Sequence, residues 1–173
     1  MSKLGLLIRT INKISRWSGV FLKFFVLAII FIVVYEIIAR YVFNHATIWA
    51  QEMTIFIFGT YAVLSGAYVY YLNGHVRMDV LYSRLSPRTK ATVDVFTSIF
   101  IFIFVIAFLW WSWGLAWKSF NARETLATSL WAPPYYPFKF MFPLGAFLLL
   151  LQTVAKFLQD IVTAITGGSR SEH

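Results

Sequence analysis

Four long runs of the chain contain few charged residues, and they constrain the fold more than any other feature of the sequence. They cover about residues 20–43, 51–73, 92–117 and 138–163. A bilayer core of ~30 Å requires roughly 20 helical residues, and each run reaches that length. Because lipid offers the backbone no hydrogen-bond partner, such runs must be helical. We predict an all-α integral membrane protein with four transmembrane helices, in which residues 1–173 form a single membrane domain.

Basic residues are distributed unequally between the two sides of this layout. They crowd the segment before the first run and the connection between the second and third runs: Lys3, Arg9, Lys13, Arg16, Lys23, Arg77, Arg84, Arg88 and Lys90. The other side carries fewer basic residues. Segments rich in Lys and Arg remain in the cytoplasm. We therefore expect both termini and the middle loop to be cytoplasmic (N-in/C-in).

Two segments outside the spans have the pattern of surface helices. In residues 4–18 one helical face carries Leu4, Leu7, Ile8, Ile11 and Ile14, and the other carries Arg9, Asn12, Lys13 and Arg16. This pattern predicts an N-terminal amphipathic interfacial helix on the cytoplasmic membrane surface. Apolar residues also recur at helical spacing in residues 76–85, which predicts a short surface helix in the middle loop.

Composition excludes several functions. The chain has no cysteine, which excludes disulfides, thiolate metal sites and iron–sulfur clusters. The net charge of +8 does not indicate a nucleic-acid partner, because the basic residues lie between apolar spans. Membrane lipids with anionic headgroups explain that charge better. No cofactor is expected.

Glu36 and Arg40 are the most distinctive charged residues within a span. At positions i and i+4 they share one helical face, with the acid N-terminal to the base, which is the favourable order. A carboxylate in lipid is costly unless it is paired. The pair could be a proton or cation site, or an ion pair that fixes this helix against a neighbour. We favour the structural interpretation because the partner lies one turn away.

Four other side chains are candidates for structural or subunit-contact roles. Trp49 and Glu52 open the second span, where an interfacial ring and an acid near a helix N-terminus are both stabilising. His75 and Asp79 follow the second span, but no histidine pair has the spacing of a haem or metal site.

In the fourth run, we expect the cationic side chain of Lys156 to reach the interface.

The second connection of this layout is rich in proline and aromatic residues between Trp131 and Pro137. Such a segment is stiff. It could pack on a large neighbour or cover the spans, and the sequence leaves both alternatives open.

Several motifs, taken together, point to a known family. Residues 40–44 (RYVFN) and 49–52 (WAQE) resemble the R-Y-x-F-N and W-x-x-E motifs of the small transmembrane subunit of tripartite ATP-independent periplasmic (TRAP) transporters. Residues 73–79 and 85–88 resemble that family's middle loop, and residues 143–145 with Gln152 are similar to its last-helix P-L-G pattern. The resemblance covers about residues 20 to 160.

The resemblance implies a non-catalytic small permease subunit in the bacterial inner membrane. Its partners would be a periplasmic substrate-binding protein, which captures an organic anion such as a C4-dicarboxylate or sialic acid, and a large membrane subunit that transports the anion with sodium. Sodium would bind to that partner subunit. Glu36, Arg40, Trp49 and Glu52 would be structural or subunit-contact positions rather than substrate ligands.

Two other functions compete with this one. A small four-helix proton-coupled multidrug exporter would use a membrane glutamate, for which Glu36 is the candidate, but Arg40 argues against a freely titrating carboxylate. A haem or quinone anchor of a respiratory complex would need histidine ligands, which the spans lack.

Overall fold

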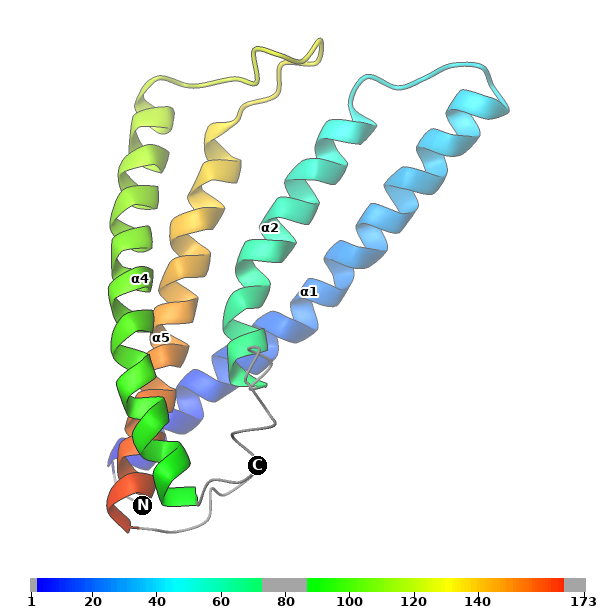
Figure 1. Cartoon of the computed structure of the whole chain (residues 1–173). Helices are drawn as coiled ribbons and strands as arrows, with labels where there is room; N and C mark the ends of the chain where they lie inside the picture. The colour runs from blue at the N-terminus through cyan, green and yellow to red at the C-terminus, as the bar shows by residue number, and fades with distance from the viewer. Residues whose placement is uncertain (1–2, 73–86, 167–173) are drawn as a thin grey trace.

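The computed structural model describes residues 3–72 and 87–166, and these form four long helices (Figure 1). The helices are α1 (Lys3–Tyr41), α2 (Ala50–Tyr71), α4 (Pro87–Asn121) and α5 (Tyr136–Thr166). Each contains a window long and apolar enough to cross a bilayer. The predicted all-α architecture with four spans is therefore confirmed. The predicted surface helix of residues 76–85 lies outside the described residues.

The helices are arranged as two antiparallel pairs, α1 with α2 and α4 with α5 (Figure 1). Helix α5 contacts the other three helices, whereas α4 packs chiefly on α5. The start of α1 and the end of α5 lie at one end of the bundle, which we call the terminal end. The connections of residues 42–49 and 122–135 lie at the opposite end, the connection end, where the two pairs diverge.

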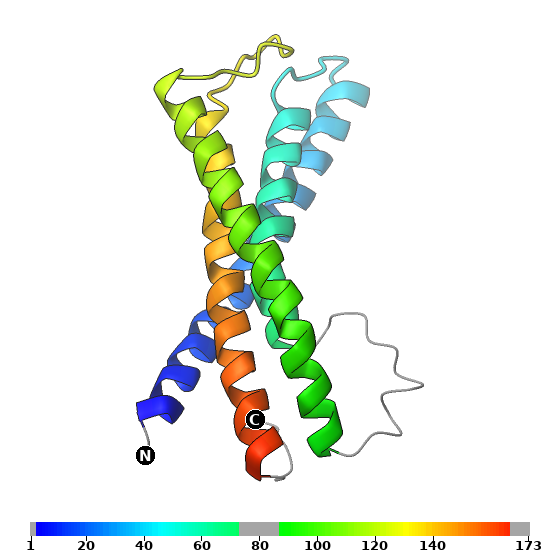
Figure 2. The ribbon, with the colours of Figure 1, turned by 60° about the vertical axis from the view of Figure 1, so that its left-hand side comes forward.

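Helix α1 is longer than a bilayer requires. Its 39 residues extend over about 58 Å at ~1.5 Å per residue, roughly twice the hydrocarbon thickness. The amphipathic segment of residues 4–18 is helical, as expected, but it continues into the first span without a break. Figure 2 shows the first turns of α1 diverging from α5, so the start of α1 runs obliquely beside the bundle.

Small residues allow α2 and α5 to approach closely. A Cβ atom on Gly145 would lie 2.4 Å from Val63 Cγ1 and 2.9 Å from the Val63 carbonyl oxygen. Nearer the connection end, a Cβ atom on Gly59 would lie 2.7 Å from the Phe138 ring, which also stacks on Phe56 with centroids 5.0 Å apart. Lipid tails provide no hydrophobic drive between helices, so close packing of this kind stabilises the pair.

The connection of residues 122–135 is internally hydrogen-bonded. Arg123 adopts a left-handed conformation (φ 45°) at the end of α4, where its N–H and that of Glu124 bond to carbonyls of the last turn. The Tyr135 N–H donates to the Glu124 carbonyl oxygen at 2.8 Å. Lys139 Nζ lies 2.5 Å from Glu124 Oε2 and 4.9 Å from the Tyr135 ring centroid. This ion pair ties the connection to the first turn of α5.

The close approach at Gly145 provides a test of the packing. We expect Gly145→Ala to lower the melting temperature, because overpacking costs about 1–3 kcal/mol and the neighbour that must move includes the Val63 backbone. Gly114→Ala is the matched control, since no atom lies within 4 Å of its added Cβ. Thermal unfolding in detergent, followed by intrinsic tryptophan fluorescence, measures both. Equal effects of the two substitutions would contradict the close α2–α5 contact.

The Lys139–Glu124 pair predicts a pH dependence. The hydrogen bond from Lys139 holds the pKa of the Glu124 carboxyl below its ordinary value of 4.5. A carboxyl whose folded-state pKa is lowered stabilises the fold at pH values above its unfolded pKa, and this contribution is lost as the pH falls through the folded pKa. Glu124→Gln should lower the melting temperature at pH 7, and the difference should shrink below pH 4.5. Lys118→Gln, on the nearby exposed surface, should show no such pH-dependent difference.

Candidate functional site

Glu36 and Arg40 form an ion pair near the connection end of α1. Arg40 Nη2 and Nε lie 2.6 and 3.1 Å from Glu36 Oε1. The two residues are one helical turn apart, so the helix itself places them on one face. The Glu36 side chain is 15% exposed and that of Arg40 is 51% exposed. The acid is therefore covered, while the guanidinium reaches the surface.

The second carboxylate oxygen of Glu36 binds the connection that leads to α2. The Thr47 backbone N–H donates to Glu36 Oε2 at 3.2 Å, and the Thr47 hydroxyl donates to the same oxygen. Both oxygens of Glu36 thus accept hydrogen bonds, one from its own helix and one from a residue eleven positions later. The carboxylate acts as a tie between the end of α1 and the entry to α2.

The end of α1 explains part of the RYVFN motif. Asn44 has φ 52°, a left-handed conformation that asparagine tolerates better than most residues. This conformation reverses the chain and lets the His45 N–H bond to the Ala39 carbonyl oxygen at 2.9 Å. The turn brings Thr47 back to Glu36. Asn44 and Glu36 therefore both stabilise the short connection of residues 42–49.

Trp49 and Glu52 lie at the start of α2, as expected. The Trp49 ring stacks on Tyr35 of α1, with centroids 5.8 Å apart, so it joins the two helices. Trp49 is the residue that precedes the helix, and its side chain makes no capping hydrogen bond. Glu52 lies in the first turn, and its buried Oε2 has no hydrogen-bond partner among the described residues. The helix N-terminus provides favourable electrostatics for this acid.

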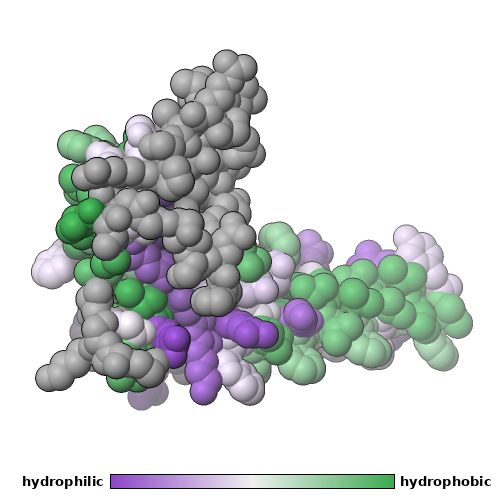
Figure 3. Space-filling model, turned by 90° about the horizontal axis from the view of Figure 1, so that it is seen from below, coloured by the Kyte–Doolittle hydropathy of each residue, from purple (hydrophilic) through white to green (hydrophobic). Residues whose placement is uncertain are grey.

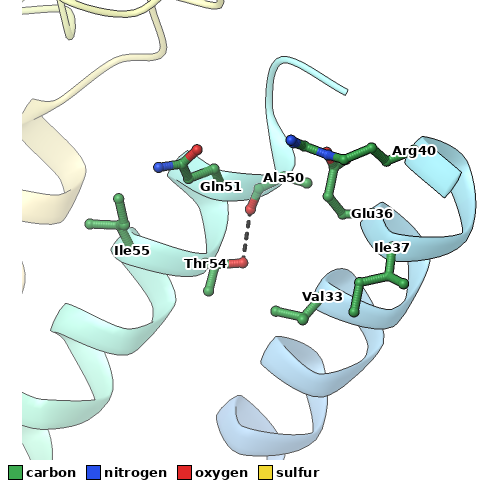
Figure 4. A pocket seen from close by; sticks show the side chains of 8 residues that line it. All are labelled: Val33, Glu36, Ile37, Arg40, Ala50, Gln51, Thr54 and Ile55. Carbon is green, nitrogen blue, oxygen red and sulfur yellow. Dashed lines mark hydrogen bonds and ion pairs between the residues drawn. The ribbon is translucent and has the colours of Figure 1, made fainter. Parts of the chain in front are cut away.

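A pocket of about 320 Å³ lies between α1 and α2 beside the ion pair (Figure 4). Its lining is formed by Val33, Glu36, Ile37, Arg40, Ala50, Gln51, Thr54 and Ile55. Figure 4 shows the Arg40 side chain extending from α1 toward the start of α2, whereas Gln51 points away from it. The Thr54 hydroxyl donates to the Ala50 carbonyl oxygen at 2.8 Å, so its polar atom is already bonded within α2. The walls of the pocket are mostly apolar, and both oxygens of the Glu36 carboxylate already accept hydrogen bonds, from Arg40 and from Thr47.

A second polar cluster joins α1 to α5 near the terminal end. The Ser15 hydroxyl donates to Gln152 Oε1 at 2.7 Å, and Gln152 Nε2 donates to Asn12 Oδ1 at 3.1 Å. Ser15 and Gln152 are both buried. The amphipathic pattern predicted that Asn12 lies on the polar face of a surface helix, and it did not predict this contact. Gln152 itself could have indicated such a contact, because a glutamine side chain within an apolar span needs a hydrogen-bond partner inside the protein.

The Lys156 side chain lies inside the bundle, whereas the sequence led us to expect it to extend outward to the membrane interface. The residue is 8% exposed, and its Nζ lies 4.6 Å from the centroid of the Tyr70 ring of α2. Asp160, one turn further along α5, is also buried. The ring attracts the ammonium group through its quadrupole, and this attraction grows when water is excluded. Lys156 and Asp160 therefore turn into the bundle rather than away from it.

His75 and Asp79 lie outside the described residues. Within residues 3–72 and 87–166, no three His, Cys, Asp or Glu side chains come together as a metal site. The described candidates that converge are Glu36, Arg40 and Trp49, at the junction of α1 and α2. None of them is arranged as a nucleophile or a general acid–base pair.

Comparison with known proteins assigns the chain to a family. The family described as "Tripartite ATP-independent periplasmic transporters, DctQ component" matches residues 29–163. No curated protein matches the chain. The matched segment contains the four apolar helices from the middle of α1 onward, including the Glu36 tie and the α2–α5 contact. Such a component works in a tripartite system with a large membrane subunit and a substrate-binding protein. The chain belongs to the DctQ family and is the small, multi-pass inner-membrane subunit of a TRAP transporter.

Proposed function

We propose that this subunit is a non-catalytic scaffold for the large membrane subunit of a sodium-coupled TRAP transporter, and that it helps to dock the substrate-binding protein. The cargo would be an organic anion of the C4-dicarboxylate or sialic acid class. The occupied carboxylate of Glu36 is the observation that carries the scaffold role. A proton or cation that bound to Glu36 would have to displace these partners, because both of its oxygens already accept hydrogen bonds from groups of the same chain.

The remaining buried charges support the same role. Lys156 is covered by an aromatic ring, and Asp160 is buried on the same helix. Transport sites near the bilayer midplane are typically built from broken helices. Each of the helices described here is continuous, and α5 continues through Pro143. The proton-coupled exporter, which requires an available Glu36, is therefore the weaker hypothesis.

The surface of α4 is well suited to a large partner within the membrane. Helix α4 packs chiefly on α5, which leaves most of its surface uncovered, and Trp110 is 84% exposed. A groove of about 670 Å³ runs between α4 and α5, and Trp113, Phe140 and Phe147 help to line it. Large aromatic side chains contribute strongly to protein–protein contacts. We propose this face as the contact with the large subunit.

The connection end would face the periplasm in this proposal. The basic residues of the first half of α1 lie toward the terminal end, and basic-rich segments remain cytoplasmic. The Glu36 tie and the connection of residues 122–135 would then be available to a periplasmic binding protein. Sodium coupling and the class of anion are supported by the motif resemblance alone, and sodium would bind to the large subunit.

Reconstitution tests the scaffold role directly. Vesicles that contain this chain alone should show no sodium-driven uptake of an organic anion. Vesicles that also contain the large subunit and the binding protein should show uptake. A sodium gradient with radiolabelled sialic acid or a C4-dicarboxylate measures the difference. Transport by this chain alone, including proton-driven export of a cation, would overturn the proposal.

Variants of the ion pair test the role of Glu36. Glu36→Ala and Arg40→Ala should lower the yield of the complex with the large subunit several-fold, because small losses of stability change abundance to that extent. The KM for the anion should not change in the complex that still forms. Gln51→Ala is the matched control, since Gln51 lines the same pocket and points away from the pair. Normal assembly with an altered KM would contradict a structural role.

A further inference from the structure

The first half of α1 presents three different faces. One face packs on the bundle: Ile11, Ser15 and Leu22 are buried. Asn12 bonds to Gln152, and a Cβ atom on Gly19 would lie 2.4 Å from the Tyr68 ring. This close packing fixes the rotation of the helix about its own axis. The orientation of the two remaining faces is therefore fixed as well.

The second face is a basic stripe, formed by Arg9, Lys13, Arg16 and Lys23. Arg9, Arg16 and Lys23 follow one another at intervals of seven residues, which is close to two helical turns. All four residues are exposed. No acidic residue precedes Glu36 in the sequence, so no nearby acid on α1 neutralises the stripe. Figure 3, which looks onto the terminal end, shows hydrophilic surface bordered by hydrophobic surface.

The third face is apolar, and its side chains are also exposed. Leu7, Ile14 and Phe21 repeat at the same interval of seven residues and are 48%, 42% and 60% exposed. Trp17, at 67% exposed, lies on the helix surface between this apolar stripe and the basic stripe. The apolar residues predicted for residues 4–18 are thus divided: Ile11 turns to the bundle, and Leu7 and Ile14 do not.

We propose that these two exposed faces form a binding surface for anionic phospholipid. The phosphodiester headgroups would pair with Arg9, Lys13, Arg16 and Lys23, while the acyl chains lie along the apolar stripe. The charges are complementary, and the helix joins cationic and apolar surface side by side, as lipid binding requires. The proposal requires only that the chain spans a membrane. It is therefore independent of the transporter role.

The oblique course of α1 supports anionic phospholipid as the ligand of this surface. From Arg9 to Lys23 the basic stripe extends about 21 Å along the helix axis. The headgroup layer is only about 5–8 Å thick on each side of the bilayer, so a helix along the membrane normal would place one or two of these cations in it. The first half of α1 instead runs obliquely past α5 (Figure 2), which brings several cations closer to one depth when the axis of the α4–α5 pair stands along the membrane normal. An acidic face of a partner protein is the competing occupant.

Binding of defined lipids tests the proposal. The full chain in detergent is titrated with phosphatidylglycerol or phosphatidylcholine, and bound lipid is counted by native mass spectrometry. We expect preference for phosphatidylglycerol, and Arg9→Gln/Arg16→Gln should lower its affinity by about tenfold or more. Lys118→Gln/Arg123→Gln is the matched control, because it removes the same charge from exposed positions at the connection end. The control variant should retain the preference.

Tryptophan fluorescence locates the bound lipid. Phosphatidylglycerol with brominated acyl chains should quench the wild-type chain, and Trp17→Phe should remove part of this quenching. Equal loss of affinity in both charge variants, or no loss in either, would overturn the proposal. Normal phosphatidylglycerol binding by Arg9→Gln/Arg16→Gln, together with loss of the complex with the large subunit, would assign the basic stripe to a protein partner instead.

Discussion

The contact between α2 and α5 at Gly145 is the constraint on which the rest of the bundle depends. In lipid, helices gain little from burying apolar surface, so their association relies on close packing and internal hydrogen bonds. At Gly145 the helices approach until the Val63 side chain and backbone occupy the space of a missing Cβ. Because α5 also contacts α1 and α4, this approach positions both helix pairs.

Several polar groups in the described part of the spans join one helix to another. Glu36 connects α1 to the entry of α2, Gln152 connects α5 to α1, and Lys156 rests on a ring of α2. Breaking any of these contacts would leave a polar or charged group without a partner in a low-dielectric environment, which costs free energy. A bundle held in this way fits the scaffold role proposed above, in which this subunit would keep its conformation while the large subunit moves.

The sequence predicted local features well and distant ones poorly. The spans and the Glu36–Arg40 pair depend on spacing along one helix, and they could be predicted from periodicity and length. The contacts of Thr47 with Glu36 and of Ser15 with Gln152 depend on a turn and on the rotation of two helices. The contact of Lys156 with the Tyr70 ring could not be predicted for the same reason, because a position near a helix end does not reveal which way the side chain turns.

The unbroken course of α1 has a mechanical consequence. A continuous helix of 39 residues resists sharp bending, since a kink would disrupt its ladder of backbone hydrogen bonds. A tilt of about 5° at one end displaces the other end of such a rod by roughly 5 Å. Displacements of the helix near Arg9 and displacements at the Glu36 junction are therefore geometrically linked, although the two sites share no side-chain contact.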